Sequence, residues 1–276
     1  VPERKPATKF LELRAKDIDK LTTDTTRIFF GVDVSCARCH DHPLVDDWKQ
    51  DHYYGMASFF NRTYATKKGF LGERDEGTLK FKPKDAAEKE AKLMFLTGSV
   101  IEEPAAPVLT EQQKKDRKKT EDMADVVPPA PAFSRRAKLV ELALQPSDDS
   151  FFAKSFANRA WNRLFGRGLV MPIDQMHSAN PPSHPELLTW LARDAMTHNY
   201  DSKRLIRGLV LSQAYSRSSR WDAGTVPAPE LFAMMALKPL SPQQYSLTLL
   251  LATANPAQTP SKPVSYTHLT LPTNRE

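Results

Sequence analysis

Two cysteines and a histidine form the motif with the clearest chemistry in this sequence. Cys36 and Cys39 are separated by two residues, and His40 follows the second cysteine directly. This spacing is typical of c-type haem attachment, in which each thiol bonds one vinyl group of the haem and the histidine ligates the iron. The chain holds two cysteines in all, so haem attachment would leave neither for a disulfide. We therefore expect haem c on Cys36 and Cys39, with His40 as the proximal iron ligand.

A zinc site is the alternative for the same two cysteines. Together with His42 they form the spacing Cys-x-x-Cys-x-x-His, which supplies three ligands of a tetrahedral zinc site. Asp41 with the two neighbouring histidines could also form a mixed carboxylate and imidazole site for zinc or iron. The histidine directly after Cys39 favours haem over both alternatives.

A haem iron ligated by His40 would take its second axial ligand from elsewhere in the chain. His42 is a poor candidate, because it lies only two residues away and would have to reach the opposite face of the ring. His52 and Met56 are far enough along the chain to fold over, so they are the candidate distal ligands. Met56 lies within an aromatic run, where a methionine commonly serves core packing. The run comprises Trp48, Tyr53, Tyr54, Phe59 and Phe60.

Length and charge limit the class of protein. A chain of 276 residues with 40% hydrophobic content can bury the core of one large domain or two smaller ones. The net charge is +6, but the lysines concentrate between Lys80 and Lys119. A charge run without interleaved aromatic residues is typical of a solvated helix or linker. We therefore expect no nucleic-acid partner.

The sequence contains no obvious targeting segment. No stretch approaches the roughly 20 apolar residues of a membrane span, and no signal peptide is visible. Because the first residues read like the interior of a domain, we expect a fragment whose export signal could lie upstream.

The composition divides the chain into four segments. Residues 1–66 mix helical patterning with the cysteine motif, and residues 67–133 form a charged and Pro-rich linker or small β-containing insert. Residues 134–262 have helical patterning, whereas residues 263–276 resemble a translated sequencing adapter and are set aside from the fold. The predicted fold is mainly α, with a helical haem-motif unit, the insert and a C-terminal helical bundle-like domain. Short strands are expected at 78–81 and 91–100.

Capping residues predict where the C-terminal helices begin. Ser134, Asp148 and Asp201 each precede a helical apolar pattern and are predicted N-caps. The stretch 183–186, Ser-His-Pro-Glu, predicts a capping box, and Pro242 after Ser241 predicts a further helix start. On the second of these helices a row of polar side chains could hold haem propionates or an acidic ligand, or make interdomain or helix-capping hydrogen bonds. The row comprises Asn158, Arg159, Asn162 and Arg163.

Three longer motifs resemble a known family. They are residues 34–43 with Trp48 and 53–55, residues 158–161 with 164–170, and residues 180–188. Together they resemble the planctomycete cytochrome-associated family, in which two domains of unknown function follow a planctomycete-type cytochrome c domain. The resemblance covers roughly residues 20 to 64 and 134 to 250, and it implies an exported, periplasmic or otherwise extracytoplasmic protein. The upstream cytochrome c domain is not part of this sequence, so haem on Cys36 and Cys39 does not follow from the resemblance.

Three functional hypotheses from different classes remain at this point. The first is an exported c-type haem protein for electron transfer or redox sensing, working with a redox partner or a cell-envelope complex. The second is a structural or binding module with a Cys/His zinc or iron site, and the third is an accessory protein in polysaccharide degradation. The sequence assigns no catalytic residue, because it contains no nucleophile elbow, phosphate loop or His-Glu-x-x-His motif.

Overall fold

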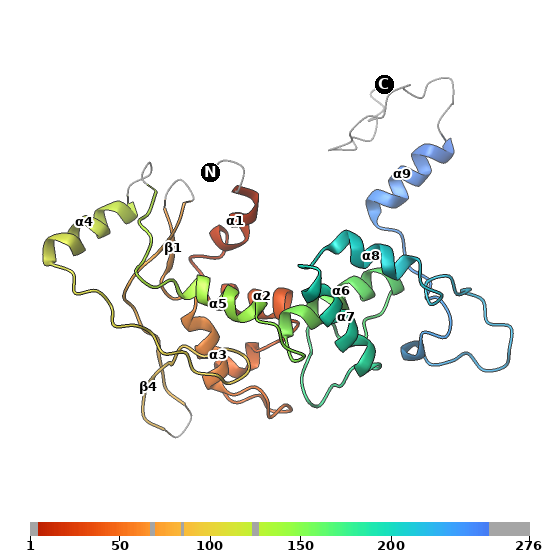
Figure 1. Ribbon diagram of the computed structural model, residues 1–276, viewed down its shortest axis with the longest axis horizontal. Coiled ribbons are helices and arrows are strands. Elements are labelled where there is room, and N and C mark those ends of the chain that lie inside the picture. Colours follow the sequence, from red (N-terminus) through yellow and green to blue (C-terminus); the bar gives the residue numbers. More distant parts are fainter. Residues whose placement is uncertain (1–4, 67–69, 84–85, 123–126, 254–276) are drawn as a thin grey trace, which may run out of the picture. The chain divides into compact units, whose positions relative to one another are not determined.

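The computed structural model describes residues 5–66, 70–83, 86–122 and 127–253. Within these ranges the fold is mainly helical with two small antiparallel sheets, which confirms the predicted class. The chain forms two compact units, residues 1–236 and 237–276. The helices of the first unit are α1 (Lys5–Glu12), α2 (Ile18–Phe30), η2 (Ser35–Arg38), α3 (Gln50–Ser58), α4 (Glu111–Asp122), α5 (Arg135–Leu144), α6 (Phe151–Phe165), α7 (Pro185–Thr197), α8 (Ser202–Val210) and η3 (Pro229–Leu231) (Figure 1).

Helix α2 leads directly into the cysteine motif. Its N-cap is Asp17, whose carboxylate accepts the Lys20 N–H, and its C-cap is Gly31, where the backbone has a φ of +67°. That left-handed conformation suits glycine, because it carries no Cβ. The next turn is the short 3₁₀ helix η2, and the fully buried side chains of Val32 and Val34 fix the segment between the two helices.

The aromatic run after the motif forms core. Helix α3 packs against η2 and α2, and its inward face buries Tyr53 and Met56, followed by Phe59 and Phe60. Burial of such side chains contributes roughly 1.5–3 kcal/mol each relative to exposure. The hydrophobic core therefore lies directly beneath the cysteine motif.

The helices of the second half pack around α6. Helix α6 contacts α2, α5, α7 and α8, and α6, α7 and α8 are grouped together in Figure 1. Two predicted N-caps are confirmed: the Ser134 hydroxyl accepts the Ala137 N–H, and the Asp201 carboxylate accepts the first amides of α8. Gly166 ends α6 with a φ of +80°. These local signals were readable because capping depends on near neighbours in the chain.

Two other predicted caps are wrong. Helix α6 is capped by Ser150, whose hydroxyl accepts the Ala153 N–H. Asp148 instead forms an ion pair with Arg193 of α7, so a tertiary contact takes the carboxylate. Helix α7 has His184 as its N-cap residue with no side-chain cap, and Pro185 occupies the first turn. The predicted capping box from Ser183 is therefore absent, and the Ser183 hydroxyl lies 3.1 Å from the His184 ring.

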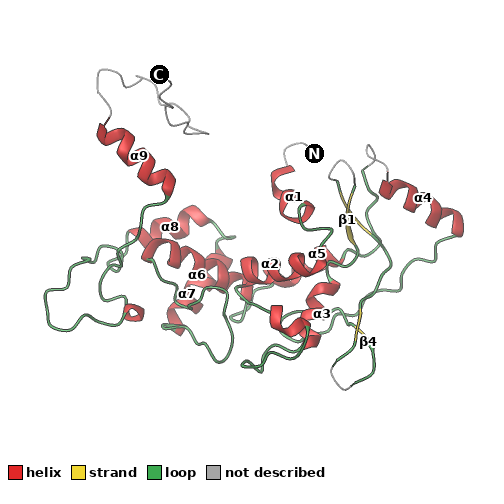
Figure 2. Ribbon diagram, turned by 180° about the vertical axis from the view of Figure 1, so that it is seen from behind, coloured by secondary structure: helices red, strands yellow, loops and turns green. Residues whose placement is uncertain are grey.

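The four strands of the described ranges follow α3 and precede α4 in the chain, and Figure 2 draws strands in yellow. Strands β1 (Thr63–Ala65) and β2 (Leu71–Glu73) form one hairpin, while β3 (Lys80–Phe81) and β4 (Lys89–Glu90) form another. The strand expected at 78–81 is partly confirmed by β3. Its partner is β4, which ends before the predicted strand at 91–100 begins. Within 91–100 the structure has an isolated bridge between Met94 and Val100. The β1–β2 hairpin was not predicted, because each strand is too short to give a pattern.

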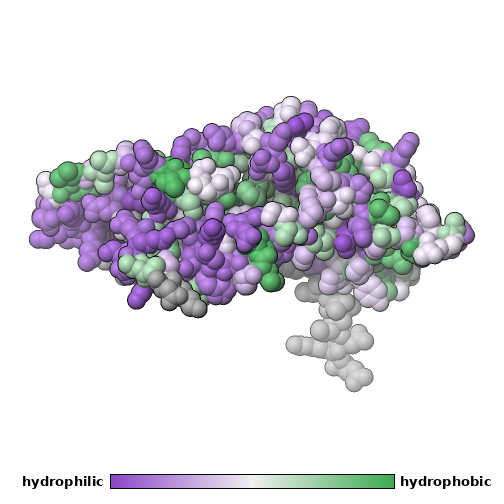
Figure 3. Space-filling view, turned by 90° about the horizontal axis from the view of Figure 1, so that it is seen from below, coloured by the Kyte–Doolittle hydropathy of each residue, from purple (hydrophilic) through white to green (hydrophobic). Residues whose placement is uncertain are grey.

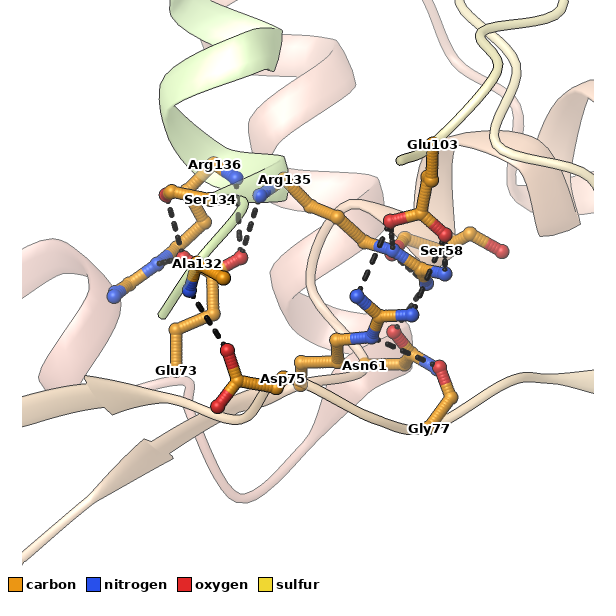
Figure 4. Close-up of polar contacts among 11 residues, drawn as sticks. Ser58, Asn61, Glu73, Asp75, Gly77, Glu103, Ala132, Ser134, Arg135 and Arg136 are labelled. Carbon is orange, nitrogen blue, oxygen red and sulfur yellow. Dashed lines mark hydrogen bonds and ion pairs between the residues drawn. The ribbon is translucent and has the colours of Figure 1, made fainter. Parts of the chain in front are cut away.

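A buried ionic network ties the insert to both helical segments (Figure 4). Glu103 accepts hydrogen bonds from Arg62, at 3.1 and 3.3 Å, and from Arg135. The Glu73 carboxylate accepts the Ser134 hydroxyl at 2.6 Å and the Arg135 N–H at 2.8 Å, so it stabilises the start of α5. The side chains of Arg62 and Arg135 are both more than nine-tenths buried. The insert therefore supplies two carboxylates, Glu73 and Glu103. Glu103 joins Arg62, which precedes β1, to Arg135, which follows the Pro-rich stretch.

The second unit is described as far as Thr253. Helix α9 (Pro242–Thr253) begins after Ser241, whose hydroxyl accepts the Gln244 N–H at 3.2 Å, as predicted. No helix in the described ranges is both long and apolar enough to cross a membrane. The face of the molecule in Figure 3 mixes hydrophilic residues with small, separate hydrophobic patches. The adapter-like residues 263–276 lie outside the described ranges.

Candidate functional site

The cysteine motif is presented on an exposed turn. Cys36 and Cys39 are exposed free thiols, and the Cys39 N–H donates to the Cys36 carbonyl at 3.3 Å. His40 is also exposed, with Nδ1 2.7 Å from the Asp41 carbonyl oxygen. Because a carbonyl oxygen only accepts, Nδ1 carries the proton, and in the neutral tautomer Nε2 has the lone pair. A metal-ligating histidine usually has this arrangement, since the bond from the other ring nitrogen fixes the tautomer.

Arg38, between the two cysteines, anchors this turn to two helices. Its guanidinium lies 2.7 Å from the Asp19 carboxylate of α2, and the Tyr53 hydroxyl of α3 donates to the same carboxylate at 2.5 Å. Burial, and then the bond to Asp19, raises the pKa of Tyr53. The Arg38 carbonyl accepts from the Gln50 amide at 3.3 Å and the Tyr54 hydroxyl at 3.2 Å. The turn is therefore fixed from both sides while its thiols stay exposed.

The structure does not assemble the alternative zinc site. The His42 Nδ1 accepts the Leu44 N–H at 3.2 Å, so a neutral His42 carries its proton on Nε2. In the described part of the chain, no group of three or more His, Cys, Asp or Glu side chains is arranged to hold a metal ion. Cys36, Cys39 and His42 thus lie on one loop without forming a metal cage.

Neither predicted distal ligand is presented to the motif with a free donor atom. Met56 is fully buried in the core. His52 is half-buried, and its Nδ1 accepts the Lys49 N–H at 3.2 Å, which places the proton of the neutral ring on Nε2. Its ring packs edge-on against Trp48 at 5.9 Å, and burial lowers its pKa.

A loop from the second half of the chain, residues 174–180, contacts residues on both sides of the cysteine motif, within 31–47. The Met176 N–H donates to the Gly31 carbonyl at 2.9 Å, and an antiparallel bridge joins Gln175 to Val32. The Ser178 N–H and hydroxyl both donate to the Asp47 carboxylate, at 2.7 and 2.6 Å. These contacts join residues more than a hundred positions apart.

His177, in the middle of that loop, was missed by the sequence analysis. It is half-buried, and its pKa is lowered by burial and by His42, against the opposing effect of Asp47. Its Nδ1 is enclosed and has no hydrogen-bond partner in the described part of the chain. Nothing in the local sequence around His177 distinguishes it, because the charged groups that affect its pKa, Asp47 and His42, come from a distant segment.

The polar row on α6 makes hydrogen bonds within the protein. Asn158 is fully buried and clamps Val170, accepting its N–H and donating to its carbonyl, each at 3.0 Å. The Arg159 guanidinium donates to the Arg27 carbonyl of α2, which joins the two halves of the chain. Of the roles predicted for this row, interdomain hydrogen bonding describes Arg159.

Comparisons with known proteins identify both halves. Residues 3–65 match the family model PSCyt2, a protein of unknown function (DUF1549), and residues 135–274 match PSD1, a protein of unknown function (DUF1553). The second match covers more than half of the chain and extends into residues 263–276. No curated protein and no solved structure gives a significant match. The chain therefore belongs to the planctomycete cytochrome-associated family, with one of its domains matched before the insert and another after it.

Proposed function

We propose that this protein binds haem covalently through Cys36 and Cys39, with His40 as the proximal iron ligand, and that it transfers electrons or senses redox state. The observation that carries the proposal is the state of the His40 ring. Its Nδ1–H donates to the Asp41 carbonyl at 2.7 Å, so the neutral tautomer has its lone pair on Nε2, where a metal would bind. Both thiols are exposed on the same turn.

The chain's own contribution is to present and orient these three groups. Each thiol would add across one vinyl double bond, with sulfur bonding one carbon and the thiol hydrogen passing to the other, so attachment needs no oxidant. Arg38, held by Asp19 and by two bonds to its carbonyl, keeps the turn in place. A bound haem would supply a one-electron redox couple whose potential depends on ligation and burial.

Haem suits the donor atoms better than zinc does. A zinc site on Cys36, Cys39 and His42 would need a free imidazole lone pair, but His42 Nδ1 is engaged by the Leu44 amide. It would also need a fourth ligand beside the three. Haem needs only the two thiols and one histidine nitrogen from this turn.

The family supports the cellular setting of the proposal. Its domains are associated with planctomycete cytochrome c proteins. We therefore propose an extracytoplasmic location, where c-type haem is attached, and a redox protein or cell-envelope complex as partner.

Mass measurement of exported protein tests the proposal. The chain would be exported to a periplasm with haem-maturation machinery, and its intact mass and pyridine-haemochrome spectrum compared with those of the double variant Cys36→Ala, Cys39→Ala. We expect a haem-sized mass increment that survives denaturation and disappears in the double variant. His42→Ala is the matched control and should keep the increment. Protein without haem that contains chelatable zinc, lost in His42→Ala, would contradict the proposal and support the metal-module alternative.

A further inference from the structure

Helices α1, α2 and α5 line an apolar cavity that the proposed haem function does not use. Its volume is about 350 Å³, which lies within the range of small-molecule sites. The cavity opens to solvent beside Val140 and Leu144 of α5, whose side chains are exposed. Its lining is mainly apolar and includes Phe10, Phe29, Phe30 and Leu139.

Helix α1, which forms one wall of the cavity, is fixed to α2. The rings of Phe10 and Phe29 pack edge to face with centroids 5.2 Å apart. Arg14 Nε lies 2.5 Å from the Asp24 carboxylate, and the Arg14 guanidinium also lies over the Phe10 ring. The cavity is therefore formed between packed helices.

Thr25 places a polar group in this apolar lining. It is 5% exposed, and its hydroxyl has no hydrogen-bond partner in the described part of the chain. The other threonine hydroxyls of α2, on Thr22, Thr23 and Thr26, each donate to a carbonyl oxygen of the same helix. A buried hydroxyl without a partner costs free energy and calls for an explanation such as a water or a ligand.

Arg136 brings a positive charge to the same cavity from the first turn of α5. In the described ranges its guanidinium hydrogen-bonds only through Nε, to the Glu73 carboxylate at 3.3 Å (Figure 4). That carboxylate also accepts the Ser134 hydroxyl and the Arg135 N–H. The two Nη groups of Arg136 can therefore pair with a further anion, and a guanidinium matches the two oxygens of a carboxylate.

We propose that this cavity binds a long-chain fatty acid, with the alkyl chain between α1, α2 and α5 and the carboxylate at Arg136. Burial of the alkyl chain against the apolar lining favours binding, and the charge of Arg136 favours an anionic head group over a neutral one. The Thr25 hydroxyl supplies a second polar contact. This inference is independent of haem attachment.

Displacement of a fluorescent fatty acid tests the proposal. The full chain, produced without haem, would be titrated with dansyl-labelled undecanoic acid, and the bound probe displaced by decanoate or by decanol below their micelle-forming concentrations. We expect saturable probe binding, and we expect decanoate to bind at least about tenfold more tightly than decanol, because only decanoate forms a charged hydrogen bond. Absence of saturable binding would overturn the proposal. Equal affinities would also overturn it, since they would indicate a site for neutral apolar molecules.

Removal of the positive charge separates the head group from the chain. Arg136→Gln should weaken decanoate binding by about tenfold and leave decanol binding unchanged. The matched control Arg207→Gln removes an exposed arginine of α8 that does not line the cavity, and it should change neither affinity. Unchanged decanoate binding in Arg136→Gln, or an equal loss for both ligands, would contradict the assigned head-group contact.

Thr25→Val separates a ligand contact from a structural role. Because it removes a buried hydroxyl that has no partner, it should not lower the free energy of unfolding, yet decanoate binding should weaken. Thr22→Val, on the same helix but outside the cavity lining, should keep the wild-type affinity. Lower stability with unchanged affinity in Thr25→Val would show a structural role and overturn this contact.

A blocking variant covers the case in which Arg136→Gln does not fold. Val140 is 56% exposed at the opening of the cavity, so Val140→Trp can be accommodated at the surface and should prevent probe binding. Val108→Trp introduces the same side chain at a fully exposed position and should bind the probe as the wild type does. Full probe binding by folded Val140→Trp would place the fatty acid elsewhere and overturn the proposal.

Discussion

The guanidinium of Arg135, at the first residue of α5, forms a two-point ion pair with the carboxylate of Glu103 in the insert. Arg62 binds the same carboxylate, so one acidic group pairs with two guanidinium groups. Arg135 also donates to the Ser58 carbonyl at 2.8 Å and to the Asn61 side chain at 2.9 Å. The insert is therefore part of the folded structure and not a free linker at this point.

Glu103→Gln should destabilise the protein by about 2–3 kcal/mol, because it removes the negative charge that both buried guanidinium groups bind. The loss of stability should be smaller than for a fully buried ion pair, since the Glu103 side chain is 22% exposed. Urea unfolding measures the change. Glu141→Gln removes an exposed partner of Lys138 and should change stability by less than about 0.5 kcal/mol. Equal effects of the two substitutions would contradict the role of the network.

The same carboxylate should make stability depend on pH. Burial favours a higher pKa for Glu103, but hydrogen bonds and charges from Arg135 and Arg62 outweigh it and lower the pKa below its ordinary value of 4.5. A lowered folded-state pKa gives stability that is complete above the unfolded value and is lost as pH falls through the folded value. Thermal unfolding should therefore show wild type and Glu103→Gln converging below pH 4.5. A constant difference between them across that range would speak against this linkage.

Asn158→Ala should cost about 2–3 kcal/mol, because it leaves the buried N–H and carbonyl of Val170 without partners. Asn162→Ala, one turn along α6 and only half-buried, should cost less than about 1 kcal/mol. Chemical denaturation of both variants makes the comparison. A larger effect of Asn162→Ala would show that the two hydrogen bonds between Asn158 and Val170 do not stabilise the loop after α6.

Tyr53→Phe should weaken the anchor of the cysteine turn, because the Tyr53 hydroxyl is a buried donor to the Asp19 carboxylate that holds Arg38. A hydrogen bond to a charged group contributes about 1.5–3 kcal/mol, so loss of stability in that range is expected. The fraction of protein carrying covalent haem after export should also fall. Tyr54→Phe removes the longer bond to the Arg38 carbonyl and should have the smaller effect on both measurements.

Asp47→Ala should release the loop of the second domain from the motif segment, because both hydrogen bonds from Ser178 end on that carboxylate. Hydrogen exchange should become faster at residues 176–178 while the core of α6 keeps its protection. The neighbouring Asp46→Ala is the matched control, since Asp46 is exposed. Faster exchange in the control alone would show that the hydrogen bonds from Ser178 to Asp47 do not hold this loop in place.

The sequence by itself determined the local features of this protein. The cysteine motif, the caps at Ser134 and Asp201, the helix end at Gly166 and the mainly helical class depend on residues within a few positions of one another. Hydrogen bonds of this range need no tertiary partner, so local patterns predict them. The family resemblance rested on similar short motifs.

The tertiary structure decided every relationship between distant segments. Asp148 was predicted as a cap but pairs with Arg193, because an arginine from α7 lies within reach of its carboxylate. Met56 was a candidate ligand but belongs to the core beneath the motif. Ser178 binds Asp47, which lies 131 positions earlier in the chain. Such contacts depend on how helices pack, and packing is set by the whole core and not by the residues next to the site.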